Sequence, residues 1–139
     1  MNKKIGILLV GIFVLAGGGM YYAQTSQEIL PSNTANMLDT VNAMDFDTRN
    51  TEQQRIIIDV RTPQEFEGGH LKGARNIDFY DTAFEHTLST LDTNAPYSIY
   101  CRSGNRSGQA LELMESLGFT DVLDLEGGIT AWVQSGKSL

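Results

Sequence analysis

Two kinds of hydrophobic pattern alternate along the chain after about residue 33. Short apolar runs at 55–60, 97–101 and 122–125 predict buried strands, and a fourth short strand is expected at 74–77. The first run contains three consecutive isoleucines, which is typical of a strand that is buried on both faces of a parallel sheet. Between these runs, apolar residues recur three and four positions apart, as in amphipathic helices. The alternation predicts an α/β fold with parallel strands.

The helical spacing predicts a helix in each interval between strands. The first should begin after a cap at Ser32 or Asn33 and run to Met44, followed by a polar surface loop at 45–54. The others are a short helix from Pro63 to Phe66, one ending at Leu91, one ending before Gly118, and a closing helix that carries Trp132.

The amino-terminal residues 1–23 have the composition of an export signal or a membrane anchor. Residues 5–23 contain no charge and follow Lys3 and Lys4. The run is just long enough to cross a bilayer of about 30 Å, with Tyr21 and Tyr22 at the far interface. A tyrosine three residues before a cut after Ala23 disfavours cleavage there, so an uncleaved anchor is slightly favoured, although 16–18 offers another cleavage site.

Either reading predicts that the protein lies in the periplasm or on the outer side of the cytoplasmic membrane, with a membrane contact if the segment is kept. Residues 24–32 are interpreted as a linker, with a possible short strand near Ile29, and 33–139 as one domain.

The composition of the chain excludes some kinds of site and argues against one class of partner. The chain of 139 residues has one cysteine, which excludes an intramolecular disulfide and a Cys-x-x-Cys site. The formal net charge of −7 argues against nucleic acid as a partner.

Cys101 stands where a predicted strand ends and a helix begins. The loop from Cys101 to Arg106 lies at a helix amino terminus, where free N–H groups bind anions. A thiolate there, close in sequence to two arginines, should have a lowered pKa and be nucleophilic. The alternative is an ordinary buried cysteine, but a core residue needs no Arg-Ser-Gly-Asn-Arg sequence after it.

The loop Cys-Arg-Ser-Gly-Asn-Arg resembles the active-site loop of rhodanese-like sulfurtransferases. Three other stretches agree with this family in order and spacing, and they are Ile57-Ile58-Asp59-Val60-Arg61, Glu65 with 69–77 (Gly-His-Leu-Lys-Gly-Ala-Arg-Asn-Ile), and 126–132 (Glu-Gly-Gly-Ile-Thr-Ala-Trp). The resemblance implies an open parallel sheet of about five strands with helices on both faces.

The resemblance also implies sulfur transfer without a metal or organic cofactor. Cys101 would take a sulfane sulfur from a small anionic donor such as thiosulfate, hold it as a persulfide and pass it to cyanide or a thiol. The substrate-binding loop would consist of Arg102, Ser103, Gly104, Asn105 and Arg106, with the two arginines attracting the anion. Asp59 and Arg61 would support the site, with an ion pair expected between Arg61 and Glu65, and His70 would be structural.

Two alternatives stay open. A cysteine phosphatase shares this fold, but its loop has five residues between cysteine and arginine, whereas this chain has four. The other alternative is a rhodanese module that carries sulfur or binds a partner without turnover.

Overall fold

The computed structural model describes residues 10–16, 19–25 and 37–139. Strands β1 (Val10–Ala16) and β2 (Gly19–Thr25) pair antiparallel and belong to a unit distinct from residues 35–139. Within the described ranges, no helix has the length and apolar character needed to cross a membrane. Export or anchoring therefore stays a prediction. The strand expected near Ile29 and the caps expected at Ser32 and Asn33 lie outside the described residues.

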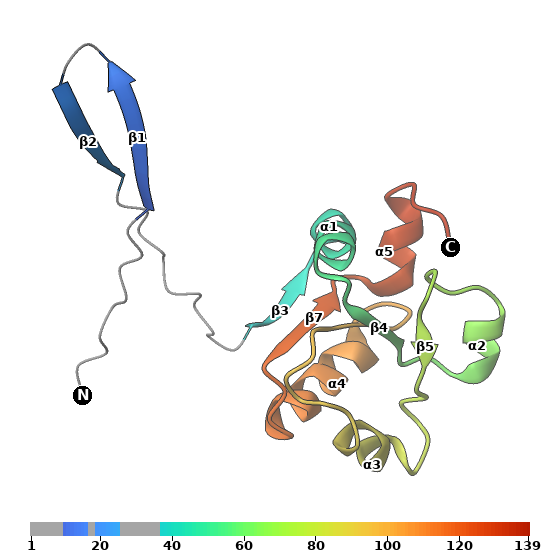
Figure 1. The fold of residues 1–139 in the computed structure, drawn as a ribbon. Helices are drawn as coiled ribbons and strands as arrows, with labels where there is room; N and C mark the ends of the chain where they lie inside the picture. The colour runs from blue at the N-terminus through green and yellow to red at the C-terminus, as the bar shows by residue number, and fades with distance from the viewer. Residues whose placement is uncertain (1–9, 17–18, 26–36) are drawn as a thin grey trace. The chain divides into compact units, whose positions relative to one another are not determined.

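Residues 37–139 form a five-stranded sheet in which every pairing is parallel (Figure 1). The strand order is β3-β7-β6-β4-β5, so β6 lies in the middle. The strands are β3 (Met37–Val41), β4 (Ile56–Asp59), β5 (Arg75–Asn76), β6 (Tyr97–Tyr100) and β7 (Asp121–Leu125). This confirms the predicted open parallel sheet of about five strands.

Helices cover both faces of the sheet (Figure 1). On one face, α1 (Ala43–Gln53) and α5 (Gly128–Gln134) supply Phe46 and Trp132 to a core with Leu123 and Leu125. On the other, α3 (Phe84–Ser89) and α4 (Asn105–Ser116) pack against Ile99, Cys101 and Val122. The short helix α2 (Pro63–Glu67) follows β4. Alternate residues of β6 and β7 thus face opposite cores, as the period of a strand requires.

The prediction of a helix reaching Met44 and a loop at 45–54 was wrong. Residues 37–41 form a strand that pairs in parallel with β7, and the helix follows it at Ala43–Gln53. The Asn42 side chain accepts hydrogen bonds from the N–H groups of Met44 and Asp45, at 2.9 and 3.0 Å, and so starts the helix there. Pairing with the edge of β7 outweighs the helical spacing of a few apolar residues.

The structural role predicted for His70 is confirmed, and Trp132 lies in the core. His70 stacks on Phe66, with 3.7 Å between ring centroids, and its Nδ1 lies 3.0 Å from the Phe66 carbonyl oxygen. Trp132 is buried in the core, and its Nε1 donates to the Ser138 carbonyl. Both residues stabilise the fold around the site.

Candidate active site

Cys101 directly follows β6, the middle strand, at the carboxyl end of the sheet. Ligand sites in open parallel sheets lie at this end of the strands. The residue is 1% exposed and packs against the same core as Ile99 and Val122. The strand therefore delivers the only cysteine of the chain to the expected place.

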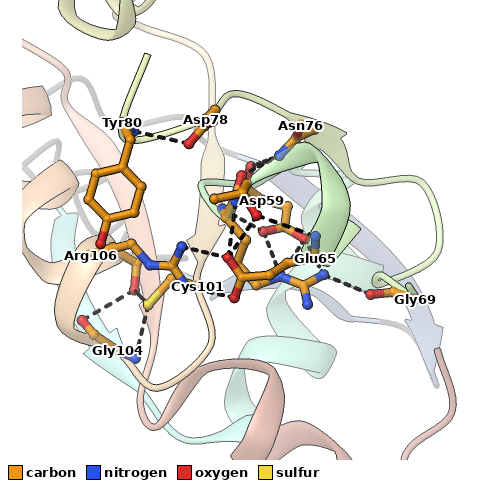
Figure 2. A network of polar contacts seen from close by, with 12 residues as sticks. Asp59, Glu65, Gly69, Asn76, Asp78, Tyr80, Cys101, Gly104 and Arg106 are labelled. Carbon is orange, nitrogen blue, oxygen red and sulfur yellow. Dashed lines mark hydrogen bonds and ion pairs between the residues drawn. The ribbon is translucent and has the colours of Figure 1, made fainter. Parts of the chain in front are cut away.

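Two hydrogen-bond donors face the Cys101 sulfur. The Gly104 N–H donates to Sγ at 3.1 Å and the Ser107 hydroxyl at 3.5 Å, and Figure 2 shows the sulfur beside Gly104. Burial acts against ionisation, but the Ser107 side chain and the backbone of residues 103, 104 and 107 outweigh it, so the pKa of Cys101 is lowered. The arrangement favours the thiolate, as predicted.

The loop turns sharply at Gly104. This residue has φ +97°, a region that side chains with a Cβ disfavour, and it is the N-cap of α4. The helix begins at the next residue, Asn105. Asn105 Oδ1 accepts a bond from Gln109 on the helix surface, and Arg102 and Ser103 are exposed. The Gly104 N–H points at the sulfur, at 3.1 Å, and the backbone of Ser103 also acts on it.

The turn between β7 and α5 braces the other side of the loop. The Ile129 N–H donates to the Cys101 carbonyl at 2.9 Å, and the Thr130 N–H and hydroxyl donate to the Arg102 carbonyl at 3.2 and 2.8 Å. Because the C=O and N–H of a trans peptide point in opposite directions, holding the Arg102 carbonyl toward α5 turns the Ser103 N–H toward the sulfur.

Gly128 makes this close approach possible. Its φ is +61°, and a Cβ at this position would lie 2.4 Å from the Cys101 carbonyl oxygen. Residues 126–132 were expected only as a stretch that agrees with the rhodanese-like family, and the contact of Gly128 with the cysteine loop was not predicted. The Gly-Gly pair one residue after a buried strand was the available signal.

Arg106 is engaged by Glu65, which corrects the expected Arg61–Glu65 pair. Arg106 Nη1 and Nη2 donate to Glu65 Oε2 and Oε1 at 2.7 and 2.9 Å, a two-point contact visible in Figure 2. Its guanidinium also lies 5.6 Å from the centre of the Tyr80 ring. The bond to Arg106 is the main cause that lowers the pKa of Glu65 to about 2.

Glu65 also fixes its own helix. Its Oε2 accepts from the Thr62 N–H at 3.1 Å, while the Glu65 N–H donates to the Thr62 hydroxyl, which forms a capping box. The Arg106 charge is therefore compensated, and its side chain fastens the start of α4 to α2. Among the described residues, Arg102 makes no ion pair and stays exposed.

Asp59 and Arg61 form a buried scaffold, as expected from the resemblance. Arg61 Nε and Nη2 lie 2.6 to 3.0 Å from the Asp59 carboxylate, and Nη2 also donates to the Gly69 carbonyl. Asn76 donates to the Asp59 and Arg61 carbonyls and joins β5 to this network (Figure 2). Asp59 is 0% exposed and Arg61 6%. These residues hold the end of β4 beside the cysteine strand.

Two side chains of the site were missed by the sequence analysis, Ser107 and Asp124. Ser107 is fully buried and donates toward Cys101, and the buried Asp124 lies on the neighbouring strand β7. No group of three or more His, Cys, Asp or Glu suited to a metal ion occurs in the described part of the chain.

Known proteins are similar to this chain in both sequence and fold. A Bacillus subtilis protein, YqhL, is 40% identical over 76 residues, which cover 55% of this chain and 59% of that protein. Thiosulfate sulfurtransferase GlpE of Pseudomonas putida is 35% identical over 77 residues, covering 55% of this chain and 68% of the relative. The crystal structure of a rhodanese-related protein from Thermoplasma volcanium superposes with a TM-score of 0.63 at 30% identity, covering 71% of this chain and 94% of that one.

The family profile described as Rhodanese-like domain matches residues 38–135, which include all five strands of the parallel sheet except the first residue of β3. The cysteine loop, the Gly128 turn that contacts it and the parallel sheet all lie within the matched residues. This chain therefore belongs to the rhodanese-like domain family.

Proposed function

We propose that this protein is a sulfurtransferase that moves a sulfane sulfur from a small anionic donor to a thiophilic acceptor through Cys101. One observation carries the proposal: the Sγ of Cys101 faces the Gly104 N–H at 3.1 Å and has a lowered pKa. The similarity to proteins named thiosulfate sulfurtransferase supports thiosulfate as the donor.

In the first step the Cys101 thiolate attacks the outer sulfur of thiosulfate. A bond forms between Sγ and that sulfur, the sulfur–sulfur bond of thiosulfate breaks, and sulfite leaves with the bonding electron pair. The product is a cysteine persulfide with one negative charge. Gly104 N–H and its neighbours in the loop would stabilise this charge, because they already point at the sulfur before the reaction.

In the second step the acceptor attacks the outer persulfide sulfur. Cyanide leaves as thiocyanate, or a thiolate leaves as a persulfide, and the Cys101 thiolate is restored. No electrons are gained or lost by the protein over the cycle. A carrier protein would complete only the first step before meeting its partner.

The two arginines of the loop have different roles in this proposal. Arg102 is exposed and would attract the anionic donor. Arg106 is held by Glu65 and would keep the loop in shape.

The covalent intermediate can be measured directly. Incubation with thiosulfate should increase the mass of the protein by one sulfur atom, and cyanide should reverse the increase. Cys101→Ser should lose both the mass change and thiocyanate production. A wild-type protein that gains no sulfur but hydrolyses a phosphatase substrate would refute the proposal, whereas sulfur loading without turnover would indicate a carrier.

We also propose that the domain is exported, because an uncharged run at 5–23 follows Lys3 and Lys4. When a reporter enzyme is fused after Leu139, its activity should be found only outside the cytoplasm. Activity restricted to the cytoplasm would contradict export, and the amino-terminal residue of the purified protein would show whether the segment is cleaved.

A further inference from the structure

A cavity of about 490 Å³ borders the cysteine loop on the side of α2 and α5. Small-molecule sites commonly measure about 300 to 1,000 Å³, so an inorganic donor of a few atoms leaves most of this space unused. The walls of this space, the Arg102 cavity, combine charged, polar and apolar side chains, among them Arg61, Glu65, Arg102, Ile129, Thr130 and Val133.

Hydrogen bonds fix the Arg102 cavity against the cysteine loop. The Ile129 N–H donates to the Cys101 carbonyl at 2.9 Å. The Thr130 hydroxyl donates to the Arg102 carbonyl at 2.8 Å. Arg102 itself follows Cys101 directly in the chain. A molecule bound in this cavity therefore lies beside the loop that holds the reactive sulfur.

One positive charge of the cavity is left without a partner. Arg61 is paired with Asp59. Glu65 holds Arg106 through two hydrogen bonds, so its negative charge is also compensated (Figure 2). Arg102 is exposed and makes no ion pair within the described part of the chain. The cavity therefore suits a ligand with one negative charge, and a guanidinium group matches the two oxygens of a carboxylate.

The wall formed by α5 and the residues after it is largely apolar. Val133 is 51% exposed, and Ile129 lies four residues before it on the same side of the helix. Leu139, also 51% exposed, lines the cavity too, and its Cδ1 would lie 3.0 Å from a Cβ placed on Gly69. A ligand with an alkyl chain would cover this surface and remove it from water, which favours binding.

We propose that the Arg102 cavity binds a small organic carboxylate with an apolar chain, and that the sulfur acceptor is a thiol of this class. This assignment rests on the proposed function and names the chemical class of its acceptor. The carboxylate pairs with Arg102, and the chain packs on Val133 and Ile129. Because donor and acceptor bind in turn, Arg102 can serve both.

The transfer step then balances as follows. The acceptor thiol loses its proton to water, and its thiolate attacks the outer sulfur of the Cys101 persulfide. A bond forms between these two sulfurs, the bond to Cys101 Sγ breaks, and Sγ keeps the bonding electron pair. The acceptor leaves as a persulfide, and the Cys101 thiolate is restored.

The acceptor step can be measured separately from donor binding. The full chain is loaded with thiosulfate, freed of excess donor and mixed with mercaptohexanoate or mercaptohexanol, which differ only at the end remote from the sulfur. Mass spectrometry follows the loss of the extra sulfur. The half-saturating concentration should be about three to five times lower for mercaptohexanoate, and about 1 M salt should remove most of this preference. Equal values for the two thiols at low salt would overturn the inference.

Variants at an exposed position place a charge inside the cavity. Val133→Asp should abolish the preference for mercaptohexanoate, since the new carboxylate competes for Arg102, and Arg102→Ala should abolish it as well. Val133→Asn has nearly the same shape without the charge and should retain most of the preference. Met44→Asp is the matched control, because Met44 is 72% exposed on α1 and does not line the cavity. A preference unchanged in Val133→Asp, or lost in Met44→Asp, would contradict the assignment.

Hexanoate, which contains no sulfur, tests the cavity without the reaction. In the Cys101→Ser protein it should shift the amide NMR signals of Gly69, after α2, and Thr130, in α5, and hexanol should shift them less. The absence of these shifts would refute the site. A wild-type protein that forms no persulfide would instead refute the proposed function and with it the role as an acceptor site, whereas hexanoate shifts in that protein would still support the carboxylate site.

Discussion

Replacing Asp124 by asparagine should stabilise the fold in a way that depends on pH. The native carboxyl group is 3% exposed and has its pKa raised from 3.8 to about 6 by burial. Below pH 3.8 the group is protonated in both the folded and the unfolded chain, and it costs nothing electrostatically. As the pH rises from 3.8 to about 6, the carboxyl group ionises in the unfolded chain but stays protonated in the folded chain, so the folded state loses relative stability. Asparagine has the same shape and never ionises.

The size of the effect follows from the two pKa values. Each pH unit between them corresponds to about 1.4 kcal/mol, so the full cost above pH 6 is about 2 to 3 kcal/mol. Solvent screening does not reduce it much, because the group is almost completely buried. Relative to wild type, Asp124→Asn should therefore gain about 2 to 3 kcal/mol between pH 4.0 and pH 7.5.

Urea unfolding of the full chain, followed by circular dichroism at both pH values, measures this change. The exposed substitution Glu112→Gln should change the free energy of unfolding by no more than about 0.5 kcal/mol at either pH. An Asp124→Asn effect of the same size at pH 4.0 and 7.5 would refute the reasoning, because it would mean that the native carboxyl group titrates normally.

Three further predictions address the loop. Arg102→Ala should raise the KM for thiosulfate several-fold and reduce its salt dependence, since an exposed charge acts within about 8 to 10 Å at ordinary ionic strength, whereas an unchanged KM would exclude this role. Glu65→Gln should lower the free energy of unfolding by about 1 kcal/mol at pH 7, a value reduced for the partial exposure of the ion pair. This difference from the wild type should shrink as the pH drops from about 4.5 toward 2, because the wild-type carboxylate becomes protonated, and urea unfolding measures it. Gly128→Ala should cost more than about 2 kcal/mol by the same measurement, while Gly136→Ala, which also has positive φ but open space around it, should cost about 1 kcal/mol.

The strands were predictable because their sequence signals are strong. The isoleucine run at 56–58 is partly buried and the run at 97–100 is completely buried, and the composition of both runs identifies them as strands. The position of the cysteine follows, since a residue just after a central parallel strand must lie at the carboxyl edge of the sheet. These strands can therefore be predicted from their own residues, without knowing which strands they pair with.

The first strand of the parallel sheet was not predictable from its own residues. β3 is a mostly exposed edge strand, in which Val41 is the one buried residue, so its apolar positions do not show a period of two. Its backbone pairs with β7, more than eighty residues later in the chain. Residues 37–41 alone do not indicate this pairing partner, and the helical spacing of Met37, Leu38 and Val41 does not correspond to a helix.

The ion-pair partners were predicted poorly because they too depend on residues that are distant in the sequence. Arg61 and Glu65 are four residues apart, yet Arg61 folds back to Asp59 and Glu65 binds Arg106 across 41 positions. Asp124 was visible in the sequence as a carboxylate inside the apolar run Val122-Leu123-Asp124-Leu125. A buried carboxylate requires a partner or a raised pKa, but the sequence does not say which, nor that Ser107 lies beside it.

In the proposed function, the loop would stabilise an anion by its backbone more than by its arginines. Arg106 is neutralised by Glu65 and Arg102 stands exposed, whereas the groups that lower the pKa of Cys101 are the Ser107 hydroxyl and N–H groups of the loop. Among those N–H groups, that of Ser103 faces the sulfur because the amino end of α5 holds the Arg102 carbonyl, at the other end of the same peptide bond, on the opposite side. Backbone dipoles fixed by folding need no reorganisation when a persulfide charge forms, and a buried site strengthens their effect. If the proposed persulfide forms, a protein of net charge −7 would in this way hold its charge mainly with backbone N–H groups and the Ser107 hydroxyl.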